Sequence, residues 1–131
     1  MSFANWEAGR QKNHEADGAQ DVCKRQSSPV IPGSKVATED ARRNFATAKN
    51  VTVATGDVAK LLPRVTSADV VVLDPPREGA GRDVIMQITG LKPRAIVYVA
   101  CDPAALARDT AYLEDHSYSL AEIRAFDLFP M

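Results

Sequence analysis

The chain has 131 residues, 45% of them hydrophobic and 25% charged, a balance typical of one ordinary globular domain. This composition excludes a disordered acidic tail, a collagen-like repeat and a scaffold held by many disulfides. The 16 Lys and Arg residues against 17 Asp and Glu residues give a net charge of −1. No global basic field is therefore available to hold a polyanion, and contact with nucleic acid would need a local patch.

The sequence also indicates in which cellular compartment the protein is expected. The longest aliphatic runs are too short to cross a bilayer, and the N-terminus lacks the pattern of a secretory signal. Cys23 and Cys101 indicate free thiols in a reducing compartment, and a single disulfide between them is the alternative. His14 and His116 lack the spacing of metal ligands, so no metal is expected. We expect a cytoplasmic protein that does not contact a membrane.

Residues 1–29 differ from the rest of the chain because they are polar and contain almost no aliphatic side chains. Phe3 and Trp6 are the only large apolar residues in this segment. We expect a polar N-terminal arm, partly helical at most, that cannot build a core alone. Residues 30–131 would form the domain proper.

After Pro29, short apolar runs alternate with amphipathic stretches. We expect strands at 30–31, 51–54, 69–73, 95–100 and 117–126, and helices at 34–49, 57–62 and 83–89 and from Pro103 to about Leu113. Ser34 and Asp102 are the expected N-caps, and Ala37, Ala41 and Phe45 the inner stripe of the first helix. The runs 69–73 and 95–100 do not alternate, which predicts fully buried strands, whereas 117–126 suits an antiparallel edge. The pattern predicts an α/β fold with a parallel sheet and helices on both faces.

Three strand ends carry residues that can do chemistry. Asp57 follows the strand 51–54, the motif Asp74-Pro75-Pro76 follows 69–73, and Cys101 follows 95–100. Ligands of such sheets bind at the carboxyl ends of the strands, so these residues are expected to line one crevice.

Each of these residues has a functional and a structural interpretation. Two prolines would make the loop after Asp74 rigid and leave its carbonyls as acceptors for a planar base, but the same tripeptide fits a tight turn. The helix after Cys101 would favour the thiolate form, whereas Asp102 would disfavour it, and free cysteines are usually inert core residues. Arg77 and Arg82 flank the diproline loop and can meet a phosphate or a base edge.

Several stretches together resemble one known family. They are Gly33–Asn44, Asn50-Val51 with Gly56–Val58, Val71–Gly79 (VVLDPPREG), Tyr98–Asp109 (YVACDPAALARD) and Asp127–Pro130. In this order and spacing they resemble the RNA (uracil-5-)-methyltransferases, which make 5-methyluridine in tRNA and rRNA with S-adenosylmethionine. The resemblance covers about residues 30–131.

The resemblance implies roles for single residues. Cys101 matches the nucleophile that adds to C6 of uracil, so that C5 can accept a methyl group. Asp74 matches the carboxylate placed near cofactor and base, and Asp57 matches the acid that faces the adenine. Arg77 lies in the same motif as Asp74 and is expected to help hold the RNA.

The chain also departs from the family. The first strand and its glycine-rich turn have no recognisable counterpart, Pro32 stands where an acid grips the ribose, and the glutamate base lies beyond Met131. The expected fold is thus an incomplete Rossmann-like class I methyltransferase sheet, a partial catalytic domain. Loss of the central first strand would leave two unpaired strand edges. The arm would fill this gap, the strands would close up, or a second copy would supply a strand in a homodimer.

The leading hypothesis is an S-adenosylmethionine-dependent RNA methyltransferase acting on C5 of uridine in tRNA or rRNA, with a role in RNA processing. A methyltransferase acting on amino groups of nucleic acids also uses an acid or amide before two prolines. Those enzymes usually place an aromatic residue next, and Arg77 at that position argues against them. The alternative from another class is a catalytically inactive RNA-binding or interaction module derived from the same family.

Overall fold

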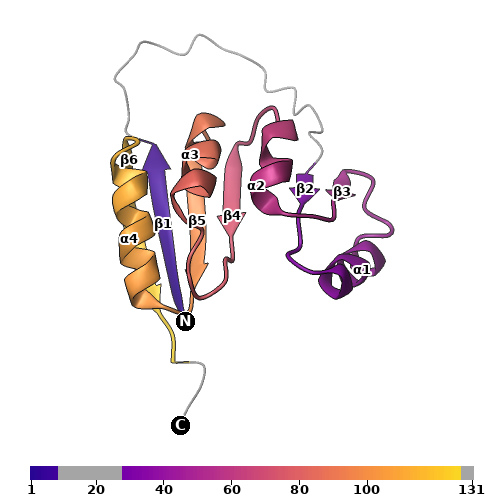
Figure 1. Ribbon diagram of the computed structural model, residues 1–131, viewed down its shortest axis with the longest axis horizontal. Coiled ribbons are helices and arrows are strands. Elements are labelled where there is room, and N and C mark those ends of the chain that lie inside the picture. The colour runs from indigo at the N-terminus through magenta and orange to yellow at the C-terminus, as the bar shows by residue number, and fades with distance from the viewer. Residues whose placement is uncertain (9–27, 128–131) are drawn as a thin grey trace, which may run out of the picture. The chain divides into compact units, whose positions relative to one another are not determined.

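A computed structural model describes residues 1–8 and 28–127 of the chain (Figure 1). The elements in chain order are β1 (Ser2–Ala8), β2 (Ser28–Val30), α1 (Lys35–Asn44), β3 (Val51–Val53), α2 (Val58–Leu61), the 3-10 helix η1 (Leu62–Arg64), β4 (Val70–Leu73), α3 (Arg82–Gly90), β5 (Ala95–Ala100), α4 (Pro103–Glu114) and β6 (Tyr118–Ala125). The predicted Rossmann-like α/β class is confirmed. None of the helices in the described part of the chain could cross a membrane.

The chain divides into two compact units. The first unit comprises Met1–Arg10 and Leu62–Met131, and the second comprises Gln11–Leu61. This division differs from the predicted boundary at residue 29, because the first residues of the chain join the unit formed by its C-terminal half.

The first unit is built on a mixed sheet with the strand order β4-β5-β1-β6. β4 and β5 run parallel, and β1 runs antiparallel to both β5 and β6. Ile96, Tyr98 and Ala100 of β5 are buried, and the residues between them are partly exposed, so one face of the sheet forms the core. α3 and α4 pack against each other on the same face of the sheet (Figure 1).

The start of the predicted arm is a strand inside this sheet. β1 pairs with β5 from Ser2 to Glu7, and Ala4 and Trp6 are buried. The Trp6 ring meets that of Tyr98 edge to face, with 6.1 Å between centroids. Residues 2–8 are thus not the short helix that the sequence allowed, and residues 9–27 of the arm lie outside the described part.

The place of β1 corrects a second expectation. β1 lies between β5 and β6, whereas β4 is at the edge of the four-stranded sheet. The arm segment therefore does not fill the predicted gap beside β4. It instead provides the antiparallel neighbour that β6 was expected to have, and β6 is the edge strand that its alternation predicted.

β4 is less buried than its unbroken apolar run predicted. Val70 and Val72 lie on the same side of the strand and are 41% and 68% exposed. The physical reason is its position, because an edge strand is covered on fewer sides than a central one. The prediction of a fully buried strand is wrong for β4 and holds better for β5, whose alternate residues are buried.

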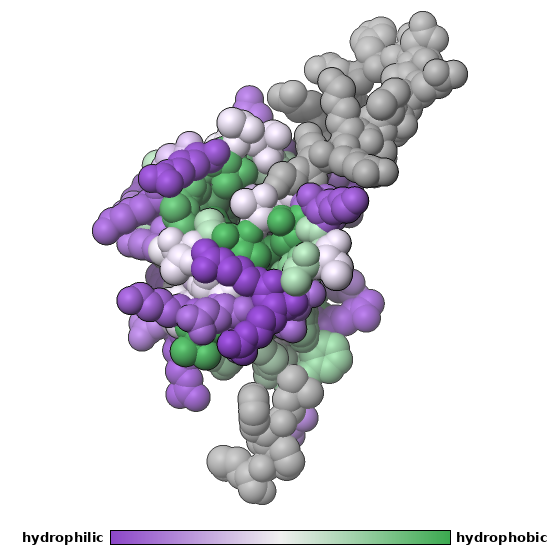
Figure 2. All heavy atoms as spheres, turned by 90° about the vertical axis from the view of Figure 1, so that its right-hand side faces the viewer, coloured by the Kyte–Doolittle hydropathy of each residue, from purple (hydrophilic) through white to green (hydrophobic). Residues whose placement is uncertain are grey.

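The second unit contains a two-stranded parallel sheet of β2 and β3, with α1 between them in sequence. Ser34 caps α1 as predicted, accepting a hydrogen bond from the Ala37 amide at 3.1 Å. The predicted inner stripe is wrong, since Thr38 is the buried residue of α1 and Phe45 is 40% exposed. Figure 2, which looks onto the side that carries α1, β2 and β3, shows hydrophobic surface among hydrophilic residues.

Replacement of Trp6 tests whether the N-terminal strand holds the sheet together. Trp6→Ala removes a fully buried ring and is expected to lower the free energy of unfolding by about 3–5 kcal/mol. Phe3→Ala, on the same strand but 36% exposed, should lower it by about 1 kcal/mol. Urea unfolding followed by circular dichroism measures both, with Trp6→Phe as the milder variant if Trp6→Ala does not fold. Equal effects at the two positions would contradict the described place of β1.

Candidate active site at the ends of β4 and β5

Two of the predicted site residues follow neighbouring parallel strands. β4 pairs with β5 from Val70 opposite Ala95 to Leu73 opposite Tyr98, so the carboxyl ends of both strands lie at one edge of the sheet. Asp74 directly follows β4, Cys101 directly follows β5, and both residues are exposed. The register therefore places a carboxylate and a free thiol at the same edge, where α/β sheets bind their ligands.

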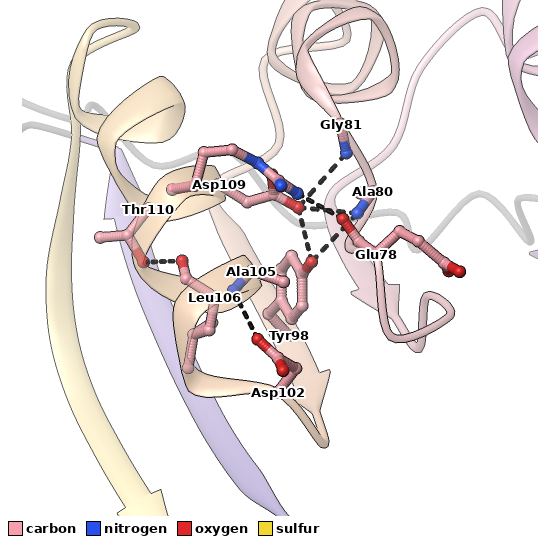
Figure 3. A network of polar contacts seen from close by, with 10 residues as sticks. Glu78, Ala80, Gly81, Tyr98, Asp102, Ala105, Leu106, Asp109 and Thr110 are labelled. Atoms are coloured by element: carbon pink, nitrogen blue, oxygen red, sulfur yellow. Dashed lines mark hydrogen bonds and ion pairs between the residues drawn. The ribbon is translucent and has the colours of Figure 1, made fainter.

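The residues after Cys101 begin helix α4. Asp102 is its N-cap, and its Oδ1 accepts a hydrogen bond from the Ala105 amide at 2.8 Å (Figure 3). Pro103 occupies the first helical position, where its lack of an N–H is harmless. The Asp102 carboxylate is thus engaged with the helix N-terminus, which is a favourable place for its negative charge.

The loop between β4 and α3 carries Asp74 and Arg77, both exposed. A turn spans Pro76–Gly79, where the Gly79 amide donates to the Pro76 carbonyl at 2.9 Å. Gly79 and Gly81 have φ values of +87° and +78°, which residues with a side chain rarely adopt. The turn thus follows the Asp74-Pro75-Pro76 tripeptide and is not capped by Asp74, whose side chain is open to solvent.

A polar network that the sequence analysis missed holds the end of this loop (Figure 3). The Asp109 carboxylate on α4 is completely buried. Its Oδ2 accepts hydrogen bonds from the Tyr98 hydroxyl at 2.6 Å and from the amides of Ala80 at 2.7 Å and Gly81 at 3.3 Å. Its Oδ1 accepts from the Arg108 guanidinium at 3.2–3.3 Å.

Tyr98 is a hydrogen-bond donor at the centre of this network. Burial, and next the hydrogen bond to Asp109, raise the pKa of the Tyr98 hydroxyl far above its usual value. The phenol therefore stays protonated, and it serves as a donor to Asp109 while its own oxygen accepts from the Ala80 amide at 3.1 Å.

Asp57 belongs to the second unit and has a local partner there. Its Oδ1 accepts a hydrogen bond from the Ala59 amide at 3.0 Å, and its Oδ2 lies 4.0 Å from Lys60 Nζ at an exposed position. Asp57 thus caps α2. Its expected place in one crevice with Asp74 and Cys101 stays a prediction, as does its contact with an adenine.

Two exposed carboxylates have the chemistry that the nucleoside end of S-adenosylmethionine requires. Exposed carboxylates such as Asp57 and Asp74 can accept hydrogen bonds from the amino and hydroxyl groups of a nucleoside. No glycine-rich turn occurs after β2, β3 or β4 of the kind that would cradle the methionine end, and Pro32 follows β2. The donor set thus fits the nucleoside end of such a group. Among the described residues no cluster of three or more His, Cys, Asp or Glu side chains could hold a metal ion.

Comparison with known proteins relates the chain to one group. No family model matches it, and no solved structure matches it. A protein from Streptomyces avermitilis named uncharacterized RNA methyltransferase is 52% identical over 103 residues, which is 77% of this chain. This chain is homologous to a part of that RNA methyltransferase. A protein of the same description from Streptomyces coelicolor is 50% identical over 77% of the chain, and one from Caldanaerobacter subterraneus is 43% identical over 76%.

The chain spans only about a quarter of the length of these relatives. The matched parts make up 24%, 22% and 24% of the three proteins. A match that covers 77% of 131 residues contains Asp57 and Asp74 wherever it begins. The similarity therefore includes two of the three strand ends that carry predicted site residues.

The cap that precedes α4 can be tested by substitution. Asp102→Ala removes the acceptor for the Ala105 amide and is expected to lower the free energy of unfolding by about 1 kcal/mol. Asp102→Asn keeps an equivalent acceptor and should change it by less than about half of that. Urea unfolding measures both, with Asp115→Ala at the other end of α4 as control. An equal loss for the Ala and Asn variants would show that the cap does not operate as described.

Proposed function

We propose that this chain forms part of the catalytic domain of an S-adenosylmethionine-dependent RNA methyltransferase that acts on C5 of uridine in tRNA or rRNA. The homologous proteins named RNA methyltransferases support the general activity. The register of β4 and β5 carries the finer proposal, because it brings the Asp74-Pro75-Pro76 motif and Cys101 to one edge of the sheet.

Cys101 is the proposed nucleophile. Its thiolate adds to C6 of the uracil, which makes C5 electron-rich and able to take the methyl group from the sulfonium donor. A general base, which is a glutamate in the family that the chain resembles, then takes the proton from C5. The electron pair of that C–H bond restores the C5–C6 double bond, and the Cys101 sulfur leaves C6 as a thiolate. The exposed position of Cys101 meets the first requirement, since a base extruded from an RNA strand has to reach the sulfur.

Asp74 is proposed to fix the geometry between base and methyl donor. It stands at the end of β4, is exposed, and is followed by two prolines that hold the loop rigid. Asp57 would accept from the adenine amino group of the donor. When bound, S-adenosylmethionine supplies an electrophilic methyl group, and the residues of this chain hold its nucleoside end.

Arg77 is proposed to contact the RNA backbone. It is exposed and lies three residues after Asp74, so its guanidinium is available for a phosphate close to the target base. With a net charge of −1, the chain has no broad basic surface to replace such a local contact.

Covalent trapping tests the role of Cys101. RNA that carries 5-fluorouridine at the target position is expected to form an adduct with the protein in the presence of S-adenosylmethionine, because fluorine cannot leave C5 as a proton does. Denaturing electrophoresis and mass spectrometry measure the adduct. Cys101→Ser should abolish it, whereas Cys23→Ser is the matched control and should retain it. An adduct that survives in Cys101→Ser would contradict the proposed nucleophile.

A second candidate function is an inactive RNA-binding or interaction module of the same descent. Pro32 favours it, because a proline stands where the family has the acid that grips the ribose of the donor. Titration calorimetry with S-adenosylmethionine separates the two functions. Saturable binding of S-adenosylmethionine in the micromolar range is expected for the enzyme. A protein that binds RNA but does not bind S-adenosylmethionine would favour the module.

The cellular setting follows from the proposed substrate. We propose the cytoplasm as its place of action, since tRNA and rRNA occur there, and RNA as its macromolecular partner. A homodimer also stays a proposal, and the edge of β4 with its exposed Val70 and Val72 is the described surface that would support it.

A further inference from the structure

The network around Asp109 connects the proposed nucleophile with the loop that carries Asp74. An isolated charge buried this completely would be strongly unfavourable, so its partners are needed. Those partners do not come from α4 alone. Ala80 and Gly81 belong to the loop after β4, and Tyr98 belongs to β5 three residues before Cys101.

Arg108 and Asp109 hold the loop as a pair. The Arg108 guanidinium donates to the Glu78 carbonyl, while the neighbouring Asp109 carboxylate accepts from the amides of Ala80 and Gly81 (Figure 3). Two consecutive side chains of one helix thus bind both a carbonyl and the following amides of the loop. This arrangement fixes the direction of the loop backbone as well as its distance from α4.

The loop in turn is shaped to accept this contact. A Cβ atom at Gly79 would lie 2.6 Å from both Arg108 Nη2 and Asp109 Oδ2, closer than real contacts allow. Gly81 is the N-cap of α3 and has no side-chain cap of its own. The Asp109 carboxylate therefore serves from another helix as a negative group at the N-terminus of α3.

Asp74 lies between two anchors of the same loop. At the start, Leu73 pairs with Tyr98 in the sheet, and at the end, Ala80 donates to the Tyr98 hydroxyl and to Asp109. Tyr98 thus takes part in both anchors. Both ends of the segment 74–80 are consequently held against β5, the strand that presents Cys101.

We propose that Asp109 is a positioning residue that sets the place of the Asp74 loop relative to Cys101. It touches neither substrate nor cofactor and acts through the backbone of residues 78–81. This inference rests on the proposed function for its catalytic consequence, while the clamp on the loop stands on the hydrogen bonds alone.

Amide exchange tests the clamp without RNA or cofactor. In Asp109→Ala, the Ala80 and Gly81 amides lose their acceptor and are expected to exchange at least about tenfold faster with deuterium, as measured by NMR. The Val97 amide in the centre of β5 should keep its rate, and Asp115→Asn on the exposed end of α4 is the matched control. Unchanged exchange at Ala80 and Gly81, or an equal increase at Val97, would overturn the proposal.

Two further variants keep this test decisive if Asp109→Ala does not fold. Tyr98→Phe removes one hydroxyl that donates to Asp109 but keeps the ring against Trp6. Gly79→Ala disturbs the same contact from the loop, because its Cβ atom would collide with Arg108 and Asp109. Both are expected to accelerate exchange at Ala80 and Gly81 as well, and normal exchange in both would count against the clamp.

Kinetics of methyl transfer test the positioning role. With S-adenosylmethionine and a tRNA or rRNA substrate, Asp109→Ala is expected to lower kcat roughly 100-fold and to leave the KM for S-adenosylmethionine within about threefold. Asp109→Asn, whose amide oxygen can still accept from Ala80, should recover part of kcat. A lower kcat in Asp115→Asn or an unchanged kcat in Asp109→Ala would overturn the positioning role. A wild-type chain without methyl transfer would contradict the proposed function, while the exchange result would still decide the clamp.

Discussion

Burial of the Asp109 carboxylate constrains the part of the molecule that carries the candidate site. A charge removed from water needs several strong partners, and α4 itself offers only Arg108. The remaining partners come from Tyr98 in the sheet and from the loop before α3. One charged group therefore joins a strand, a loop and a helix, and the shape of the loop follows from the need to satisfy it.

The sequence predicted the elements whose signals are local. The N-caps of α1 and α4 and the antiparallel edge strand β6 were found at the expected places, whereas β5, predicted to be fully buried, is buried on one face and partly exposed on the other. β1 was missed because its segment is polar and lies far in sequence from its partners. A short signal was present, since the apolar Ala4 and Trp6 alternate with the polar Asn5 and Glu7. Burial of β4 was overestimated because sequence does not show which strand lies at an edge.

The candidate site likewise contains residues that the sequence predicted and one that it missed. Asp74 and Cys101 could be predicted because both follow apolar runs, and parallel strands place their carboxyl ends together. Asp109 was missed because an acid within a helix usually faces solvent. Its spacing from Leu106 and Leu113 nevertheless put it on the buried side of α4. The identity of its loop partners depends on the fold of a segment 28 and 29 residues away, which a local pattern does not contain.

The central place of β1 has a consequence for how the protein folds as it is synthesised. β1 leaves the ribosome well before its partners, because β5 and β6 begin only at residues 95 and 118. Contacts over such separations require closure of a long loop, which slows folding relative to a chain of local contacts. Until then the indole of Trp6 has no core to enter, and β1 stays unpaired. This interval exposes the polypeptide to aggregation and to binding by chaperones.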